Sequence, residues 1–127
     1  MKTLLTVSVV LFAVGCAATA RGPLAPKNPT GPVLVYTSAT CGEACFALTN
    51  HLRSRGVAHM ERDVDLMPGA RDELMQKLDE AGLTANQPPV LDFRGTILVG
   101  YDQLSIDQLC DADHRAQSQL RTRAASR

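Results

Sequence analysis

The sequence contains no tryptophan and few other aromatic residues, since only two tyrosines and three phenylalanines occur among its 127 residues. Proteins that bind bases or sugars by stacking need several aromatic side chains, so this class of binding is disfavoured. An excess of charge is also missing, because 13 lysines and arginines balance 13 aspartates and glutamates. That balance argues against a nucleic-acid partner. The length corresponds to one domain, which we expect to be monomeric.

No apolar run of the sequence is long enough to cross a membrane comfortably, but residues 1–15 have the layout of an export signal. A single cation, Lys2, precedes an apolar run from Leu4 to Val14. The next cysteine, Cys16, resembles the lipidated cysteine of bacterial lipoproteins, although Ala13 stands where leucine is usual. The alternative is ordinary signal cleavage after Ala20. We expect an exported, periplasmic protein that is anchored to the membrane through a lipid on Cys16.

Proline is concentrated between this signal and the first predicted strand. Pro23, Pro26, Pro29 and Pro32 recur at every third position. Such a segment buries little apolar surface and favours an extended backbone, so residues 16–32 are predicted to form a tether. Residues 33–116 are the predicted domain, and residues 117–127 are predicted to fray as a polar tail.

Hydrophobic patterning predicts elements in the order β-α-β-α-β-β-α. The first helix carries Cys45, Leu48 and Leu52 at spacings of three and four, which is typical of one buried helix face. Arg94-Gly95 lies between two apolar runs and fits the two-residue turn of a β-hairpin. The predicted strands are 33–36, 57–64, 89–93 and 96–99, and the predicted helices run from Cys41 to Gly56, from Pro68 to Gly82, and from Asp102 or Ser105 onward.

Several short segments occur in an order that is typical of one family. They are Val33 to Thr37 followed by Thr40-Cys41, then Arg55-Gly56-Val57, Asp63-Val64-Asp65, Pro89 to Gly95, and Gly100-Tyr101-Asp102. Over residues 33–109 the chain resembles the glutaredoxin branch of the thioredoxin fold. The resemblance implies an α/β fold with a four-stranded mixed sheet flanked by helices. It also implies thiol–disulfide exchange with protein thiols, protein disulfides or glutathione as partners, and no bound cofactor.

The resemblance assigns roles to individual residues. Cys41 would be the nucleophile at the start of the first helix, where backbone N–H groups and the helix dipole favour a thiolate. Cys45 would resolve the mixed disulfide. Pro89 would be a cis proline that lies against the two sulfurs. The other residues that the resemblance places in a substrate or glutathione site are Thr40, Pro88, Gly100, Tyr101 and Asp102.

The two cysteines depart from the family pattern, because three residues separate Cys41 from Cys45 where glutaredoxins have two. In a regular helix, Cβ atoms at i and i+4 are about 6 Å apart, whereas a disulfide needs about 3.8 Å. We therefore expect Cys41 at or before the N-cap and Gly42 outside helical geometry. Glu43 adds a negative charge and Ser38 replaces a frequent lysine, so we expect a less acidic Cys41 than is usual.

The residue before the cis proline is a second departure. In the family its backbone pairs with glutathione, but Pro88 has no N–H group to donate. If Pro88 were itself the cis residue, Gln87 would donate instead. The sequence leaves both assignments open.

Other interpretations of the same residues also stay open. In an oxidising compartment Cys41 and Cys45 could form a structural disulfide, and two cysteines on a helix suit a soft ion such as Cu(I). Gly100 and Asp102 could form only a turn and a helix cap. Cys110 falls on the apolar stripe of the last helix and is predicted to be buried. The histidines show no ligand-like spacing, so no metal site is assigned; they are His51, His59 and His114.

The favoured function is that of a cell-envelope thiol–disulfide oxidoreductase that uses the Cys41/Cys45 dithiol. The alternative is a non-catalytic lipoprotein that uses a thioredoxin fold to bind a partner protein or Cu(I). The sequence does not decide between an oxidising and a reducing role, because that depends on a potential set by local electrostatics.

Overall fold

The computed structural model describes residues 22–127, and the predicted signal segment, Cys16 and the cleavage site at Ala20 lie outside them. Within the described residues, no helix has both the length and the apolar character needed to cross a membrane. The elements follow the predicted order. They are β1 (Val33–Thr37), α1 (Gly42–Ser54), β2 (Met60–Asp63), α2 (Ala70–Glu80), β3 (Val90–Phe93), β4 (Thr96–Val99) and α3 (Gln103–Ala125).

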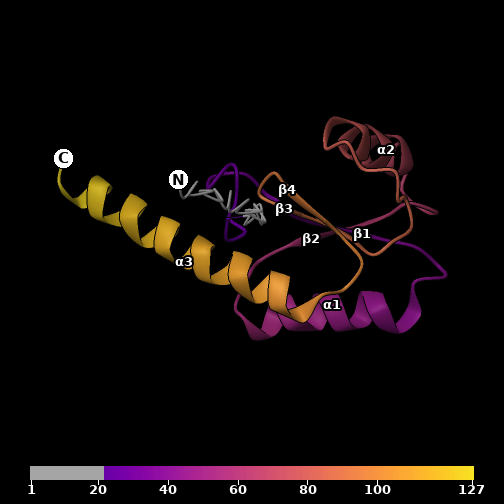
Figure 1. Cartoon of the computed structure of the whole chain (residues 1–127), viewed down its shortest axis with the longest axis horizontal. Helices are drawn as coiled ribbons and strands as arrows, with labels where there is room; N and C mark the ends of the chain where they lie inside the picture. The colour runs from indigo at the N-terminus through magenta and orange to yellow at the C-terminus, as the bar shows by residue number, and fades with distance from the viewer. Residues whose placement is uncertain (1–21) are drawn as a thin grey trace, which may run out of the picture.

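The strands form one mixed sheet in the order β2-β1-β3-β4. β1 pairs with β2 in parallel, while β3 pairs with β1 and with β4 in antiparallel. Figure 1 shows α2 on one side of the sheet, with α1 and α3 on the other. This architecture is the thioredoxin-like, glutaredoxin-type fold that the sequence predicted.

Two apolar cores lie on the two faces of the sheet, because neighbouring side chains of a strand point to opposite sides. On the first face Val33 and Val35 of β1 pack with α1 and α3, and on the second Leu34 and Tyr36 pack with α2. All four of these side chains are buried, as expected for a central strand covered on both sides.

The turn between β3 and β4 has the predicted hairpin geometry. Arg94 and Gly95 both have positive φ, at 48° and 91°, as a type I′ turn requires. Asp92 Oδ1 accepts a hydrogen bond of 2.8 Å from the Gly95 N–H. The turn fixes the register that places Phe93 opposite Thr96.

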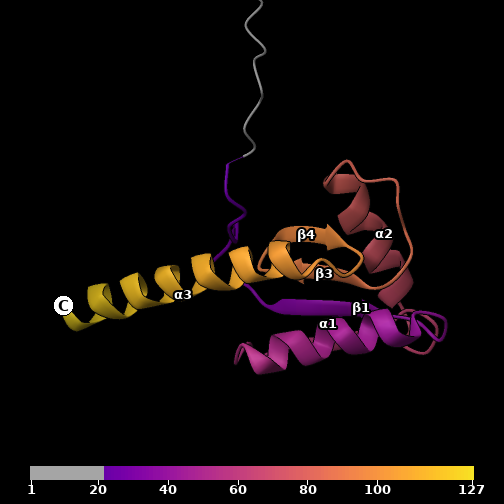
Figure 2. The same ribbon diagram turned by 60° about the horizontal axis from the view of Figure 1, so that its bottom comes forward.

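The prediction that residues 117–127 fray is wrong for most of that segment, because α3 continues to Ala125. Alanine, glutamine and arginine are good helix formers, so a polar sequence can still extend a helix. Gln117 Nε2 also donates to the Pro29 carbonyl at 2.7 Å and to Asp113 Oδ1 at 3.2 Å, which ties the extension to the domain. Figure 2 shows the last turns of α3 projecting beyond the sheet.

The tether prediction also needs correction for its described part, residues 22–32, which lie against the domain. Thr96 Oγ1 donates to the Ala25 carbonyl at 2.6 Å, and the Asn28 N–H donates to the Arg94 carbonyl at 2.8 Å. Leu24 packs against the core on the α1 and α3 face. Prolines lack an N–H group, but the carbonyl groups of this segment still accept hydrogen bonds from the hairpin and from α3.

The hydrogen bond from the Tyr36 hydroxyl to Glu73 predicts an acid-sensitive contribution to stability. Tyr36 donates to Glu73 Oε1, and this bond is the largest cause that lowers the pKa of Glu73. A depressed carboxylate pKa stabilises the fold above the unfolded value and loses that effect as the pH falls through the folded value. We expect Tyr36→Phe to lower the free energy of unfolding by about 1.5 kcal/mol at pH 7.

The pH dependence distinguishes this hydrogen bond from general packing. Urea unfolding at pH 7 and at an acidic pH should show that the wild type and the Tyr36→Phe variant converge in stability as the pH falls through the lowered pKa of Glu73, because protonation removes the charge that Tyr36 stabilises. A difference that stays equal at both pH values would contradict the assignment.

Candidate active site

A disulfide joins Cys41 and Cys45 at the start of α1, with 5.5 Å between the Cα atoms. Cys41 is the N-cap residue, as predicted, and Gly42 has a φ of +42°, outside helical geometry. The disulfide can join cysteines four positions apart because the backbone departs from helical geometry at Gly42. The disulfide lies at the junction between β1 and α1.

The two sulfurs differ in their surroundings. Cys45 is buried inside the domain, whereas Cys41 is only half-buried. The Ser38 N–H donates to Cys41 Sγ at 3.2 Å. A backbone N–H at this distance favours a thiolate, as does the N-terminal end of the helix. Cys41 is therefore the sulfur that a visiting thiol or disulfide can reach, and its Sγ lies against both the N–H and, at 3.1 Å, the carbonyl oxygen of Ser38.

The cis peptide bond precedes Pro89, which is one of the two assignments that the sequence left open. Pro89 is buried, and its carbonyl accepts a hydrogen bond of 2.8 Å from the Gly100 N–H. Gly100 is thus placed beside the cis proline by a backbone contact, and its own φ of +83° lets the chain turn there.

A groove of about 620 Å³ runs between the β1–α1 loop, α2 and the segment before β3. Thr40 and Pro88, two of the residues predicted for a substrate site, both line it. Ser38, whose N–H donates to Cys41, is a third lining residue. The remaining lining residues are Val64, Asp65, Arg71, Leu74, Met75, Asn86 and Gln87.

The structure places Tyr101 and Asp102 away from this groove. The Tyr101 hydroxyl lies 2.9 Å from His51 Nδ1, and His51 Nε2 lies 2.7 Å from Asp107 Oδ1, so this network joins α1 to α3. Asp102 caps α3 by accepting from the N–H and hydroxyl groups of Ser105, and the Ser105 hydroxyl lowers the pKa of Asp102. In this arrangement Asp102 has the capping role that was one of its two predicted interpretations.

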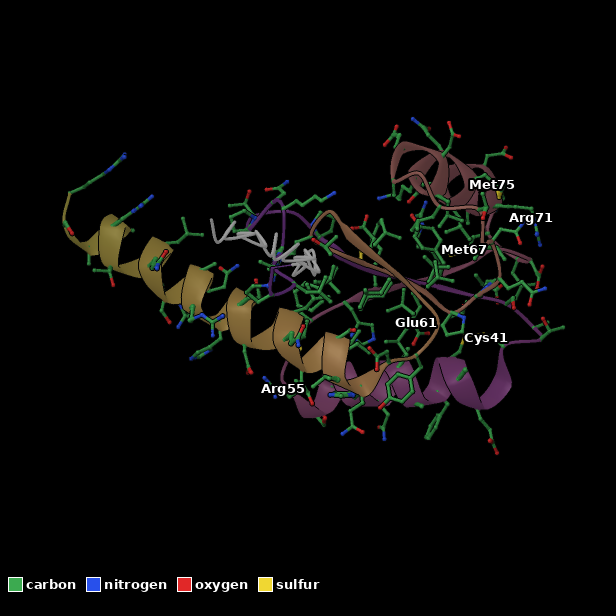
Figure 3. All side chains as sticks on the ribbon, viewed as in Figure 1. Cys41, Arg55, Glu61, Met67, Arg71 and Met75 are labelled. Atoms are coloured by element: carbon green, nitrogen blue, oxygen red, sulfur yellow. A yellow bond between two sulfur atoms is a disulfide. The ribbon has the colours of Figure 1, made fainter. Side chains whose placement is uncertain are left out.

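Two groove residues were not predicted from the sequence as site residues. Asp65 Oδ2 accepts a hydrogen bond of 2.9 Å from the Ala39 N–H, and Asp65 Oδ1 forms an ion pair of 2.6 Å with Arg71. Figure 3 shows Arg71 at the same end of the molecule as Cys41. Asp65 was noted only within Asp63-Val64-Asp65, and its position directly after a strand was the one signal available.

Comparison with known proteins identifies the family of this chain. The sequence model of the glutaredoxin family matches residues 33–97. The chain belongs to the glutaredoxin family. A solved glutaredoxin from Archaeoglobus fulgidus superposes with a TM-score of 0.51 at 21% identity, covering 63% of this chain and 86% of the other. That similarity shows the shared fold. No curated protein matches the sequence.

Glutaredoxins need no bound cofactor, and they use glutathione as a co-substrate. Among residues 22–127 of this glutaredoxin, no three histidine, cysteine, aspartate or glutamate side chains come together as a metal site. His51 is engaged with Tyr101 and Asp107, as described above.

Cys110 of this glutaredoxin is a free thiol that is buried in the core between the sheet and α3, as its place on the apolar stripe predicted. Burial raises its pKa, so little thiolate forms at neutral pH. After mild reduction, we expect iodoacetamide to modify Cys41 at least about tenfold faster than Cys110 at pH 7.5. Mass spectrometry of the alkylated peptides measures both rates, and equal rates would contradict a structural role for Cys110.

Proposed function

We propose that this chain is a cell-envelope thiol–disulfide oxidoreductase in which Cys41 attacks and Cys45 resolves. The observation that supports this most directly is the position of the Cys41–Cys45 disulfide. It lies at the start of a helix, with its outer sulfur next to the Ser38 N–H and beside a groove. A purely structural cross-link needs neither the backbone donor nor the open face.

The reaction proceeds by two thiol–disulfide exchanges. The Cys41 thiolate attacks one sulfur of a substrate disulfide, so that a mixed disulfide forms and the other substrate sulfur leaves as a thiolate. The Cys45 thiolate then attacks Cys41 Sγ, which forms the Cys41–Cys45 disulfide and releases the second substrate thiolate. The substrate gains two electrons, and a thiol reductant such as glutathione or a dithiol protein returns the pair to the reduced state.

The proposed location depends on the export signal, on the lipobox-like Cys16 and on the proline-rich segment that follows. An anchor at Cys16 would keep the domain on the periplasmic side of the membrane. Protein disulfides form and persist in that oxidising compartment. Cell fractionation with metabolic palmitate labelling tests this proposal. Label that persists in a Cys16→Ala variant would contradict lipidation at this residue.

Two measurements on the purified chain test the chemistry. We expect dithiothreitol-dependent reduction of insulin, and a Cys41/Cys45 reduction potential within the range of exchange catalysts. A potential below about −300 mV together with no insulin reduction would mark the disulfide as a structural cross-link and contradict the proposal.

A further inference from the structure

We propose that the arginine-rich end of α3, residues 114–127, binds the phosphate headgroups of an anionic lipid membrane. This inference goes beyond the thiol–disulfide chemistry, and the position of the membrane rests on the proposed anchor at Cys16. The segment holds four of the chain's 13 lysines and arginines and none of its 13 aspartates and glutamates. The four are Arg115, Arg121, Arg123 and Arg127. A chain without net charge therefore concentrates positive charge at one end of one helix.

These four arginines differ from the other arginines of residues 22–127 in having no acidic partner there. All four are exposed, and none forms an ion pair with a described residue. The other arginines of the described range all form ion pairs; they are Arg53, Arg55, Arg62, Arg71 and Arg94. The helix dipole accounts for little of this pattern, because its effect is confined to the last turn, where only Arg123 lies. Guanidinium groups without a carboxylate partner are well suited to phosphate oxygens.

The end of α3 projects from the domain on the side opposite to the disulfide. Figures 1 and 2 both show its last turns beyond the sheet, away from the junction of β1 and α1. Figure 3 shows Cys41 at that distant junction. Ala125 lies eight residues beyond Gln117, so the helix continues for about 12 Å past the contact of Gln117 with Pro29. A flat membrane surface can therefore approach the last arginines without meeting the rest of the domain.

The segment before β1 leads to the proposed anchor from the same end of the domain. Residues 22–32 are held on the hairpin and on α3 by the hydrogen bonds described above. Six residue steps separate Cys16 from Gly22, and even a fully extended chain of that length spans only about 21 Å. A lipid on Cys16 would therefore hold this end of the domain near the membrane. The arginines would then face the headgroups, while the Cys41–Cys45 disulfide would face away from the membrane toward protein substrates.

The test measures how the chain from residue 16 onward, carrying Cys16→Ala and hence no lipid, partitions onto vesicles in a flotation assay. We expect it to bind vesicles of phosphatidylcholine with about one-third phosphatidylglycerol at least about a hundredfold more strongly than pure phosphatidylcholine vesicles at low salt. About 1 M salt should abolish the difference, because it shortens the Debye length to about 3 Å. Arg121→Gln/Arg123→Gln should lower partition onto the anionic vesicles about twentyfold, at about fivefold per arginine. Glutamine is a good helix former, and circular dichroism checks that α3 persists.

The matched control is Arg53→Gln/Arg71→Gln, which makes the same change in net charge at side chains that are 58% and 64% exposed. It should change the partition by less than about twofold, because these residues lie outside the end of α3. Equal binding to the two kinds of vesicle, or equal losses for the two double variants, would overturn the inference. Tighter binding to single-stranded DNA than to the anionic vesicles would also overturn it. The result is independent of the proposed function, which insulin reduction and palmitate labelling test separately.

Discussion

Replacing Cys41 with serine should lower the rate of insulin reduction by roughly 10³-fold or more. A serine hydroxyl does not ionise near neutral pH and forms no disulfide, so neither exchange step has a nucleophile. The Ser38 N–H, which donates to Cys41 Sγ at 3.2 Å, would still be present but would have no thiolate to stabilise. The measurement is the dithiothreitol-dependent rate of insulin reduction, with the uncatalysed rate subtracted.

Two other cysteine variants serve as controls for this experiment. Cys45→Ser retains the attacking thiol and loses the resolving one, so it should accumulate a mixed disulfide with substrate that mass spectrometry detects. Cys110→Ser removes a buried thiol outside the site and should retain most of the activity. A Cys41→Ser protein that keeps more than about a tenth of the wild-type rate would show that the chemistry lies elsewhere.

Local sequence signals were sufficient to predict the parts of the fold whose physical cause is local. The apolar run 33–36 predicted a strand, and the structure places Val33 and Val35 on one face of β1 and Tyr36 on the other. Arg94-Gly95 predicted its turn because it separates two apolar runs by two residues and ends in a glycine, which accepts positive φ. The position of Cys41 at the N-cap followed from the distance that a disulfide can span.

The charge pair in the groove could not be predicted in this way. Asp65 follows β2 and Arg71 lies in α2, and their pairing depends on how α2 packs over the sheet. The contact between Asp65 and Ala39 joins residues 26 positions apart. Tyr101 was assigned to the glutathione site by resemblance, yet its hydroxyl contacts His51, fifty positions away in the chain.

The corrections at the two ends of the domain have one common cause. Residues 22–32 and the last turns of α3 were each judged from their own composition, and each is polar or proline-rich. In the structure the two segments meet at Gln117, the first residue of the predicted tail, whose Nε2 donates to the Pro29 carbonyl at 2.7 Å. Arg94 adds a second link, since its side chain donates both to the Gly31 carbonyl and to Asp113 of α3.

Of the ion pairs described, the pair of Arg94 with Asp113 should contribute most to the free energy of unfolding, so removing the Arg94 side chain should destabilise the protein most. Arg94 Nε donates to Asp113 Oδ1 at 2.9 Å, and the Asp113 side chain is only 11% exposed. Arg94→Ala leaves this carboxylate without its cation, and we expect the free energy of unfolding to fall by about 3 kcal/mol. Alanine is preferred to glycine here, because glycine would also relieve the positive φ of 48° and mask part of the loss.

Urea unfolding and amide hydrogen exchange together measure this effect. Arg53→Ala is the matched control, since Arg53 pairs with Glu61 where the two side chains are 58% and 49% exposed, and its loss should cost less than about 1 kcal/mol. In the Asp113→Ala background, Arg94→Ala should cost much less than in the wild type, because no buried carboxylate is left unpaired. Faster exchange at the Asn28 amide in Arg94→Ala would show that this side chain also holds residues 22–32 on the domain. If Arg94→Ala and Arg53→Ala lowered the free energy of unfolding equally, the burial of Asp113 would add nothing to the cost of losing its cation.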